Sequence, residues 1–410
     1  MIGRWFANSN RITALDKIKL SNRVQRVKPS PTLSVTARVA ELRAAGKDII
    51  GLGAGEPDFN TPEHIGAAAI EAIRSGFTRY TAVDGTPELK RAIIAKFKRD
   101  NGLDYAPEQI LVSCGGKQSF FNLCQALLNP GDEVIIPAPY WVSYPDMVRL
   151  ADGEPVIIRA GVETGFKITP EQLQAAITPR TRLFVINSPS NPTGVAYSRA
   201  ELAALGEVLK QAPQLLIATD DMYEHILWSK EPFSNILNPC PELYPRTIVL
   251  NGVSKVYAMT GWRIGYAGGP AELIKSMKKV QSQSTSNPTS ISQVAAQAAL
   301  EGDQSCIEPM LKAFRERHDF VVSALNDIPG VNCLPADGTF YCFPYMQPAI
   351  DAIDGVADDV ELAEYLLDQA GVALVPGTAF GSPGYMRLSF ATGMDVLQEA
   401  LSRLTTALTP

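Results

Sequence analysis

The sequence predicts an α/β fold, with a mainly parallel sheet between helices and a smaller α+β domain beside it. Two observations lead to this prediction. Short apolar runs alternate with amphipathic stretches of helical period through most of the chain. After residue 300 this alternation gives way to long helical stretches and shorter strand-like pieces. Ligands of such folds gather at the carboxyl ends of the strands, so a site is expected in the segments that follow the apolar runs.

The elements of the large sheet follow from the apolar runs and the stretches between them. Each run is short and apolar enough for a strand buried on both faces, whereas each stretch is long enough for several helical turns. Strands are expected at 110–112, 133–136, 182–186, 215–217 and 247–250. Covering helices are expected at 86–100, 117–128, 198–211 and 270–283.

The rest of the chain is expected to form a second domain. With 410 residues the chain is too long for one compact core. The later elements are a helix at 303–326, strand-like pieces around 339–344, 372–375 and 385–390, and a closing helix at 394–407. The predicted division is an N-terminal arm at 1–25, a small domain at 26–60 and 305–410, and a large domain at 61–304.

Composition argues against several classes of function. The net charge of −6 gives no basic excess for nucleic acid, and no run of about 18 apolar residues is present to span a membrane. Six scattered cysteines without a CxxC pair, and three separated histidines, argue against a metal site. The cysteines indicate reduced thiols in the cytoplasm. Residues 1–20 have no apolar core and do not resemble a secretory signal.

The most specific motif is the segment NGVSKVYAMTGWRIG at 251–265. A lone lysine is usually a solvated surface residue, but Lys255 follows an apolar strand and has small or apolar neighbours. Burial lowers the pKa of a lysine and favours the nucleophilic amine that forms an imine. Arg263 supplies the planar set of donors that suits a phosphate. The segment therefore predicts a nucleophilic lysine beside an anion site.

Polar residues also follow two other predicted strands. Asp220 and Asp221 are either a turn or helix cap, or acids with a chemical role. Tyr223 comes shortly after them. The proline-rich turn NSPSNPTG at 187–194 holds Asn191.

Two loops complete the first half of the candidate site. The turn SCGGKQ at 113–118 opens a helix with glycines that let backbone N–H groups approach a phosphate, although many strand-to-helix turns contain glycine. It is not a Walker A loop, because Leu111 stands where that pattern needs glycine. Trp141, in PYWVSYP, belongs to an aromatic cluster of the kind that is often core.

Two outlying segments carry further polar signals. Arg387 stands inside an apolar strand, which costs free energy unless an anion pairs with it. The glycines of GLGAGEP at 51–57 allow a turn or a close backbone approach. They are not a dinucleotide-binding fingerprint, because Glu56 and Pro57 stand where a helix should begin. A nicotinamide dehydrogenase is therefore excluded, and a purely structural protein would have no use for these charges on apolar strands.

Together these motifs resemble the class I aminotransferases of fold type I, from about Asn22 to Leu408. The resemblance implies pyridoxal 5′-phosphate (PLP) as the cofactor, bound by a large domain with a seven-stranded sheet. It also implies a ping-pong reaction of amino acids and 2-oxo acids, and a homodimer with shared active sites.

The resemblance assigns a role to each motif. Lys255 carries the cofactor as a Schiff base and moves the proton at the substrate Cα. Asp220 bonds the pyridine nitrogen, Tyr223 and Asn191 bond the ring hydroxyl, and Trp141 stacks on the ring. The phosphate is assigned to Gly115, Gly116, Lys117, Ser254, Arg263 and, from the neighbouring subunit, Tyr80.

The resemblance also assigns the substrate contacts. Arg387 clamps the α-carboxylate, with Gly55, Trp141 and Asn191 beside it. The segments GGKQ, PYWVSYP and SQSTSNP are similar to the bacterial branch of aspartate aminotransferases, in which the lysine at Lys117 pairs with the distal carboxylate.

Some members of that branch also use prephenate, and two residues here match the positions associated with it. These are Thr81 and Lys167, although Lys167 is also typical of a solvated loop. Two departures from the family are Asp-Asp-Met at 220–222 in place of Asp-Glu-Ile, and Gly-Thr-Phe at 338–340 in place of Gly-Ala-Phe. An aminotransferase with another amino-acid preference, or a PLP lyase, stays open because Lys255 serves both.

Overall fold

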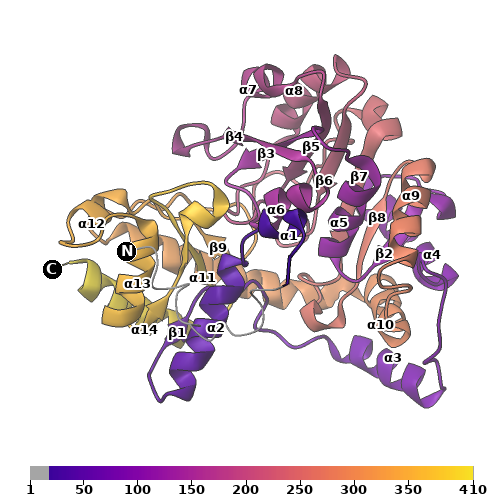
Figure 1. Cartoon of the computed structure of the whole chain (residues 1–410). Helices are drawn as coiled ribbons and strands as arrows, with labels where there is room; N and C mark the ends of the chain where they lie inside the picture. Colours follow the sequence, from indigo (N-terminus) through magenta and orange to yellow (C-terminus); the bar gives the residue numbers. More distant parts are fainter. Residues whose placement is uncertain (1–17, 410) are drawn as a thin grey trace.

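The computed structural model describes residues 18–409, and its centre is a sheet of seven strands in the order β2-β8-β7-β6-β5-β3-β4 (Figure 1). Neighbouring strands are parallel except at β8, which is antiparallel to both β2 and β7. The predicted fold class is confirmed. The strands are β2 (Ile110–Ser113), β3 (Glu133–Ala138), β4 (Glu154–Arg159), β5 (Thr181–Asn187), β6 (Leu216–Asp220), β7 (Thr247–Gly252) and β8 (Gly265–Gly268).

Helices cover both faces of this sheet because successive side chains of a strand point to opposite sides. On β7, Ile248 and Leu250 enter one core and Val249 enters the other. The first face carries α5 (Gly116–Leu127), α6 (Ser143–Leu150) and α9 (Ala271–Ser282). The second carries α4 (Pro87–Lys96), α8 (Arg199–Lys210) and α10 (Ser290–Glu301), with α3 (Glu63–Arg74) against α10 and α7 (Pro170–Ala176) against α8.

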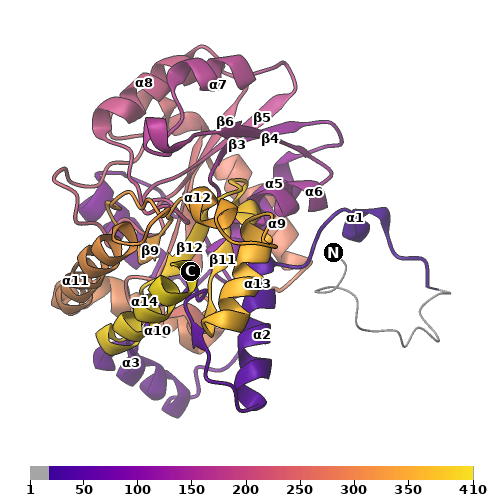
Figure 2. The same ribbon diagram turned by 90° about the vertical axis from the view of Figure 1, so that its left-hand side faces the viewer.

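The C-terminal part of the chain builds two small sheets beside the large one (Figure 2). One has the order β11-β12-β9 and is antiparallel, and in the other β1 pairs in parallel with β10. These strands are β1 (Ile50–Gly51), β9 (Tyr341–Cys342), β10 (Val372–Ala373), β11 (Val375–Pro376) and β12 (Met386–Ser389). The helices of this part are α2 (Pro31–Ala44), α11 (Ile307–Asn326), α12 (Gln347–Asp351), α13 (Asp359–Gln369) and α14 (Met394–Leu408).

The N-terminal segments belong to both parts of the molecule. The short helix α1 (Asn22–Gln25) contacts α6, whereas α2 buries Val39 and Leu42 against Leu367 of α13. The division at 1–25, 26–60 with 305–410, and 61–304 stays a prediction, and most of its N-terminal arm lies outside the described residues. No helix within 18–409 is both long enough and apolar enough to cross a bilayer.

The segment at 336–341 joins the two parts of the fold. The backbone N–H of Gly338 donates to the carbonyl of Gly194 at 2.9 Å, in the loop after β5. The N–H of Thr339 donates to the carbonyl of Ile226 at 2.8 Å, in the loop after β6. The loops at the carboxyl edge of the large sheet are therefore fixed against residues from the C-terminal part.

Two predicted helices differ from the observed ones at their ends. The helix expected at 86–100 is α4 up to Lys96 and then a π turn over Phe97–Asn101, which ends at Gly102 with a φ of 67°. The helix expected at 303–326 starts as a 3-10 turn over Gln304–Cys306 and becomes α-helical at Ile307. In the first case a left-handed glycine closes the helix, as is common at helix C-termini.

Candidate active site

Polar side chains gather where the parallel strands β5, β6 and β7 end. Asn191 lies in the turn after β5, Asp220 is the last residue of β6, and Lys255 follows β7. Because parallel strands end at one edge of a sheet, these three residues face a common space. The three residues come together because each of their motifs lies at or just after the end of an apolar strand, as expected from the sequence.

Lys255 is the half-buried amine of this space. Its Nζ donates a hydrogen bond to the carbonyl oxygen of Gly55, which comes from the segment after β1. Burial, and then the nearby charge of Arg387, lower the pKa of Lys255 to about 8. No carboxylate among the described residues forms an ion pair with it. At pH 7 about a tenth of the amine is therefore neutral, roughly two orders of magnitude more than for an ordinary lysine, and the neutral form is the nucleophile.

Asp220 is the half-buried acid of the same space. Its Oδ2 accepts a 2.5 Å hydrogen bond from the hydroxyl of Tyr144, and its Oδ1 accepts a longer one from the backbone N–H of Met222. Burial raises the pKa of Asp220, and the hydrogen bond from Tyr144 opposes that rise. Tyr144 had no assigned role from the sequence, although it lies within PYWVSYP. A cationic ring nitrogen would give this carboxylate a positively charged partner.

Asp221 points elsewhere and has its own partners. Thr219 donates to it at 2.6 Å and Asn235 at 3.1 Å. Burial, followed by the charge of Glu224, raises its pKa to about 8. Of the two adjacent acids, Asp220 faces the site, whereas Asp221 is fully buried inside the protein.

The start of α5 forms a cradle with Arg263. Gly115 has a φ of 86°, and a Cβ added to it would lie 2.4 Å from Nη2 of Arg263. Arg263 also donates to the carbonyl of Cys114 at 3.4 Å. The helix begins at Gly116, so its first N–H groups point outward toward this cradle, and Ser254 is buried in the loop before Lys255. An anion fits this set of donors.

Lys117 and Trp141 form the next wall. Nζ of Lys117 lies 5.1 Å from the centroid of the Trp141 ring, and that ring packs edge-on against Tyr144. Burial, and then the charge of Arg263, lower the pKa of Lys117. Within 18–409 no carboxylate pairs with this cation.

Arg387 is a fully buried cation on β12. It donates from Nη1 to Oδ1 of Asn191 at 2.9 Å and from Nη2 to the carbonyl of Gly53 at 2.8 Å. Its Nε has no hydrogen-bond partner among the described residues, and its guanidinium lies over the rings of Tyr341 at 4.4 Å and Phe380 at 5.0 Å. An unpaired, buried guanidinium favours a carboxylate ligand.

Tyr223 reaches the same space from the loop after β6. Its hydroxyl is 3.2 Å from the hydroxyl of Tyr341, and burial raises its pKa well above the ordinary value. Tyr341 was not singled out from the sequence. It directly follows Gly-Thr-Phe at 338–340, where the sequence departs from the family pattern, and that departure was the feature of the sequence that could have pointed to Tyr341.

The comparison with known proteins decides the family. The family described as aminotransferase class I and II matches residues 47–404. This chain is a class I and II aminotransferase. Enzymes of the family depend on PLP to move amino groups between amino acids and 2-oxo acids.

Close relatives of this aminotransferase carry more specific names. It is 63% identical over 396 residues to the aspartate/prephenate aminotransferase of Nitrosomonas europaea, which covers 95% of this chain and 100% of that one. It is 57% identical over 389 residues to the corresponding enzyme of Cereibacter sphaeroides, covering 94% and 97%.

Solved structures agree with the fold. The aspartate aminotransferase from Rhizobium meliloti matches with a TM-score of 0.92 and 49% identity, over 95% of this chain and 99% of that one. The aspartate aminotransferase from Thermus thermophilus with maleate matches with a TM-score of 0.90 and 44% identity, over 95% and 100%. The assignment to fold type I is therefore confirmed.

Three residues assigned from the sequence do not reach the site within one aminotransferase chain. Tyr80 is 91% exposed. Thr81 accepts a hydrogen bond from Gln293 at 2.9 Å. Lys167 forms an ion pair with Glu201 at 2.7 Å. Their roles stay predictions, and those of Tyr80 and Thr81 depend on a second copy of the chain.

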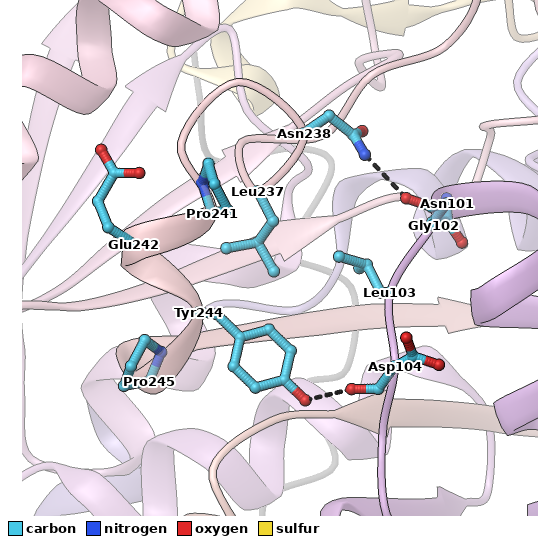
Figure 3. A pocket seen from close by; sticks show the side chains of 10 residues that line it. All are labelled: Asn101, Gly102, Leu103, Asp104, Leu237, Asn238, Pro241, Glu242, Tyr244 and Pro245. Atoms are coloured by element: carbon cyan, nitrogen blue, oxygen red, sulfur yellow. Dashed lines mark hydrogen bonds between the residues drawn. The ribbon is translucent and has the colours of Figure 1, made fainter.

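A cavity outside the site lacks the chemistry of the site. It has a volume of about 630 Å³ between 101–104 and 237–245, where Tyr244 donates to the carbonyl of Asp104 (Figure 3). None of its lining residues is basic.

A cluster of possible metal ligands at Asp100, Glu224 and His225 lies outside the site as well. It already contains a cation, because Nζ of Lys96 contacts Glu224.

Proposed function

We propose that this aminotransferase exchanges the amino group of L-aspartate or L-glutamate with a 2-oxo acid such as oxaloacetate or 2-oxoglutarate. The observation that carries the proposal is a pair of cations, the buried Arg387 and the more exposed Lys117, that have no carboxylate partner within 18–409. A dicarboxylate would supply one negative charge to each. A relative with the name aspartate aminotransferase has a structure with maleate, which is itself a dicarboxylate.

The residues present fit PLP. The cradle of Gly115, Gly116 and Arg263 would hold its phosphate, and the carboxylate of Asp220 would hold its ring nitrogen in the protonated form. Tyr223 would donate to the ring hydroxyl. When bound, PLP withdraws electrons from the substrate Cα and so makes its proton acidic.

Residues of the chain transfer the proton and orient the substrate. Lys255 accepts the proton that leaves the substrate Cα and returns it at the next stage, because its lowered pKa makes both forms accessible. Arg387 orients the α-carboxylate and Asn191 fixes the guanidinium through its Oδ1. Arg387, Asn191 and Tyr223 are buried, and the low dielectric around them strengthens these charge interactions.

The active unit in this proposal is a homodimer. Ile70 and Ile73 on α3 are 51% and 53% exposed, and Phe77 and Tyr80 continue this apolar surface. A second copy would cover them and would receive Tyr80 at its phosphate cradle. The six cysteines are unpaired, which supports the cytoplasm as the location.

Prephenate is proposed as a further acceptor. The support is the name of the relatives at 63% and 57% identity, together with Thr81 and Lys167. Lys167 is held by Glu201 here, so this part of the proposal depends on the relatives more than on the geometry.

A panel of amino donors tests the substrate. Aspartate, glutamate, phenylalanine and alanine are offered with 2-oxoglutarate, oxaloacetate or prephenate as acceptor, and the product amino acid is measured. Aspartate and glutamate should give the highest kcat/KM. A preference for phenylalanine would favour an aromatic aminotransferase, and ammonia or a cyclised product without a new amino acid would favour a PLP lyase.

A further inference from the structure

Tyr341 is a buried residue to which the proposed mechanism gives no task. It begins β9, is 1% exposed, and stands at the joint between the two parts of the fold. Its hydroxyl is 3.2 Å from that of Tyr223, and the face of its ring lies 4.4 Å below the guanidinium of Arg387. One side chain thus touches the residue proposed for the cofactor's ring hydroxyl and the residue proposed for the substrate carboxylate.

The surroundings fix Tyr341 in this place. A Cβ added to Gly55 would lie 3.2 Å from its hydroxyl, so the backbone that accepts the bond from Lys255 closes one side. Thr339, which is fully buried, has a φ of 67° and accepts the backbone N–H of Tyr341 on its Oγ1 at 3.3 Å. A β-branched residue rarely adopts this conformation, which is strained. Such strain persists where the surrounding structure holds it in place.

We propose that Tyr341 is a positioning residue that acts on the cofactor's ring hydroxyl through Tyr223 and on the substrate carboxylate through Arg387. The inference rests on the proposed function. When Tyr223 donates its proton to the ring hydroxyl oxygen, its own oxygen is free to accept, and the hydroxyl of Tyr341 is the donor within reach. This second bond makes Tyr223 a stronger donor. The aromatic face of Tyr341 offsets part of the cost of burying the cation of Arg387.

The test compares two deletions of different parts of the side chain. Tyr341→Phe removes the hydroxyl and keeps the ring, whereas Tyr341→Leu removes both. Tyr105→Phe is the matched control, because Tyr105 is a buried tyrosine whose hydroxyl has no partner among the described residues.

The first readout is the pH midpoint of the absorbance change of the PLP-loaded enzyme, which reports the proton shared between the lysine nitrogen and the ring hydroxyl. The ionisable groups around Lys255 and Tyr341 are Glu56, Asp220, Tyr223, Arg263 and Arg387.

A hydrogen bond to the ring hydroxyl oxygen stabilises its deprotonated form, so weakening that bond raises the midpoint. We expect Tyr341→Phe to raise it by roughly half a pH unit, and Tyr223→Phe to raise it further. The double variant should match Tyr223→Phe alone, because Tyr341 acts through Tyr223. Tyr105→Phe should leave the midpoint unchanged.

The second readout is the dissociation constant of maleate, which binds without turnover. Tyr341→Phe should change it by less than about twofold and Tyr341→Leu should raise it roughly fivefold, since only the second variant removes the ring under Arg387.

Three results would overturn the inference. One is a Tyr341→Phe midpoint equal to wild type while Tyr223→Phe shifts, and another is a double variant in which the two shifts add in full. The third is an unchanged maleate constant in Tyr341→Leu. If Tyr223→Phe itself leaves the midpoint unchanged, the proposed cofactor placement fails first, which distinguishes the two failures.

Discussion

At the scale of single residues, the site combines buried and half-buried charges, and Lys255 and Arg387 have no carboxylate partner within 18–409. Lys255 and Arg387 were identified from the sequence because a charge next to an apolar strand is unusual, whereas Asp220 was chosen over Asp221 through the family resemblance. Tyr144 and Tyr341 were not, because a buried tyrosine is ordinary in a core, and only the folded chain shows that their hydroxyls meet Asp220 and Tyr223.

The first prediction concerns the pH dependence of cofactor capture. The pKa of Lys255 is lowered to about 8, so its amine is protonated below that pH and nucleophilic above it. The rate at which the apoprotein takes up PLP should rise as the pH increases through about 8 and then level off. Stopped-flow absorbance measures this rate. A midpoint near 10.4, as for an ordinary lysine, would contradict the prediction.

The second prediction separates the two adjacent acids. Asp220→Ala removes the charge that holds the ring nitrogen protonated, so kcat should fall by roughly a thousandfold. Asp221→Ala leaves the hydroxyl of Thr219 and the amide of Asn235 without their partner, so it should lower the free energy of unfolding by about 1–3 kcal/mol with a much smaller loss of kcat. Steady-state kinetics and urea unfolding measure both effects. The opposite order of kcat losses would show that Asp221 is the catalytic acid.

The third prediction concerns Lys117. Its loss should weaken aspartate and glutamate more than phenylalanine or alanine, because only the acidic donors have a distal carboxylate. Because Lys117 is exposed in the free chain, the loss of its ion pair with the distal carboxylate should cost roughly 1 kcal/mol. The ratio of kcat/KM between acidic and neutral donors is measured for Lys117→Ala at saturating PLP, since Lys117 also borders the phosphate cradle. Arg387→Ala is the control and should weaken all donors alike.

At the scale of elements, the strands with uninterrupted apolar runs were predictable and the others were not. β4 is an edge strand with exposed residues at both ends, and β8 has four residues of which two are glycine. Neither looks like a buried run. The π turn after α4 ends at Gly102. Gly102 lies beyond the helical pattern at 86–100, so that pattern does not predict the turn.

The fourth prediction concerns the start of α5. Gly115→Ala places a methyl group against Arg263 at a φ of 86°, so it should weaken PLP binding at least tenfold. Gly131→Ala is the matched control, because Gly131 has a φ of 88° and nothing within 4 Å of an added Cβ. Both changes should cost about 1 kcal/mol of stability from the backbone. Equilibrium dialysis of PLP separates them, and equal affinities in the two variants would show that Gly115 is no part of the cradle.

At the scale of the whole molecule, the site draws on segments from Gly55 to Arg387. The motifs of these segments could be recognised in the sequence. The segments come together in space because of the joint at 336–341 and the pairing of β1 with β10. No local pattern encodes such contacts between distant segments. The exposed surface at Ile70, Ile73 and Tyr80 is a further feature that only the fold shows.

The fifth prediction concerns that surface. Ile73→Asp should convert the dimer to monomers and abolish most activity, because a charge would be buried at the interface. Val360→Asp is the control, since Val360 is also an exposed apolar residue, on α13. Light scattering at the assay concentration gives the mass of each variant. Full activity of a monomer would refute the shared site.

The unpaired guanidinium of Arg387 also has a consequence for the lifetime of the protein. Because its burial without an anion opposes folding, any carboxylate that binds there shifts the balance between folded and unfolded chains. Each tenfold rise in free ligand above its dissociation constant adds about 1.4 kcal/mol to the folded state. In a cell, the supply of substrate would therefore regulate the abundance of the enzyme as well as its rate, since unfolded chains are the ones that proteases remove.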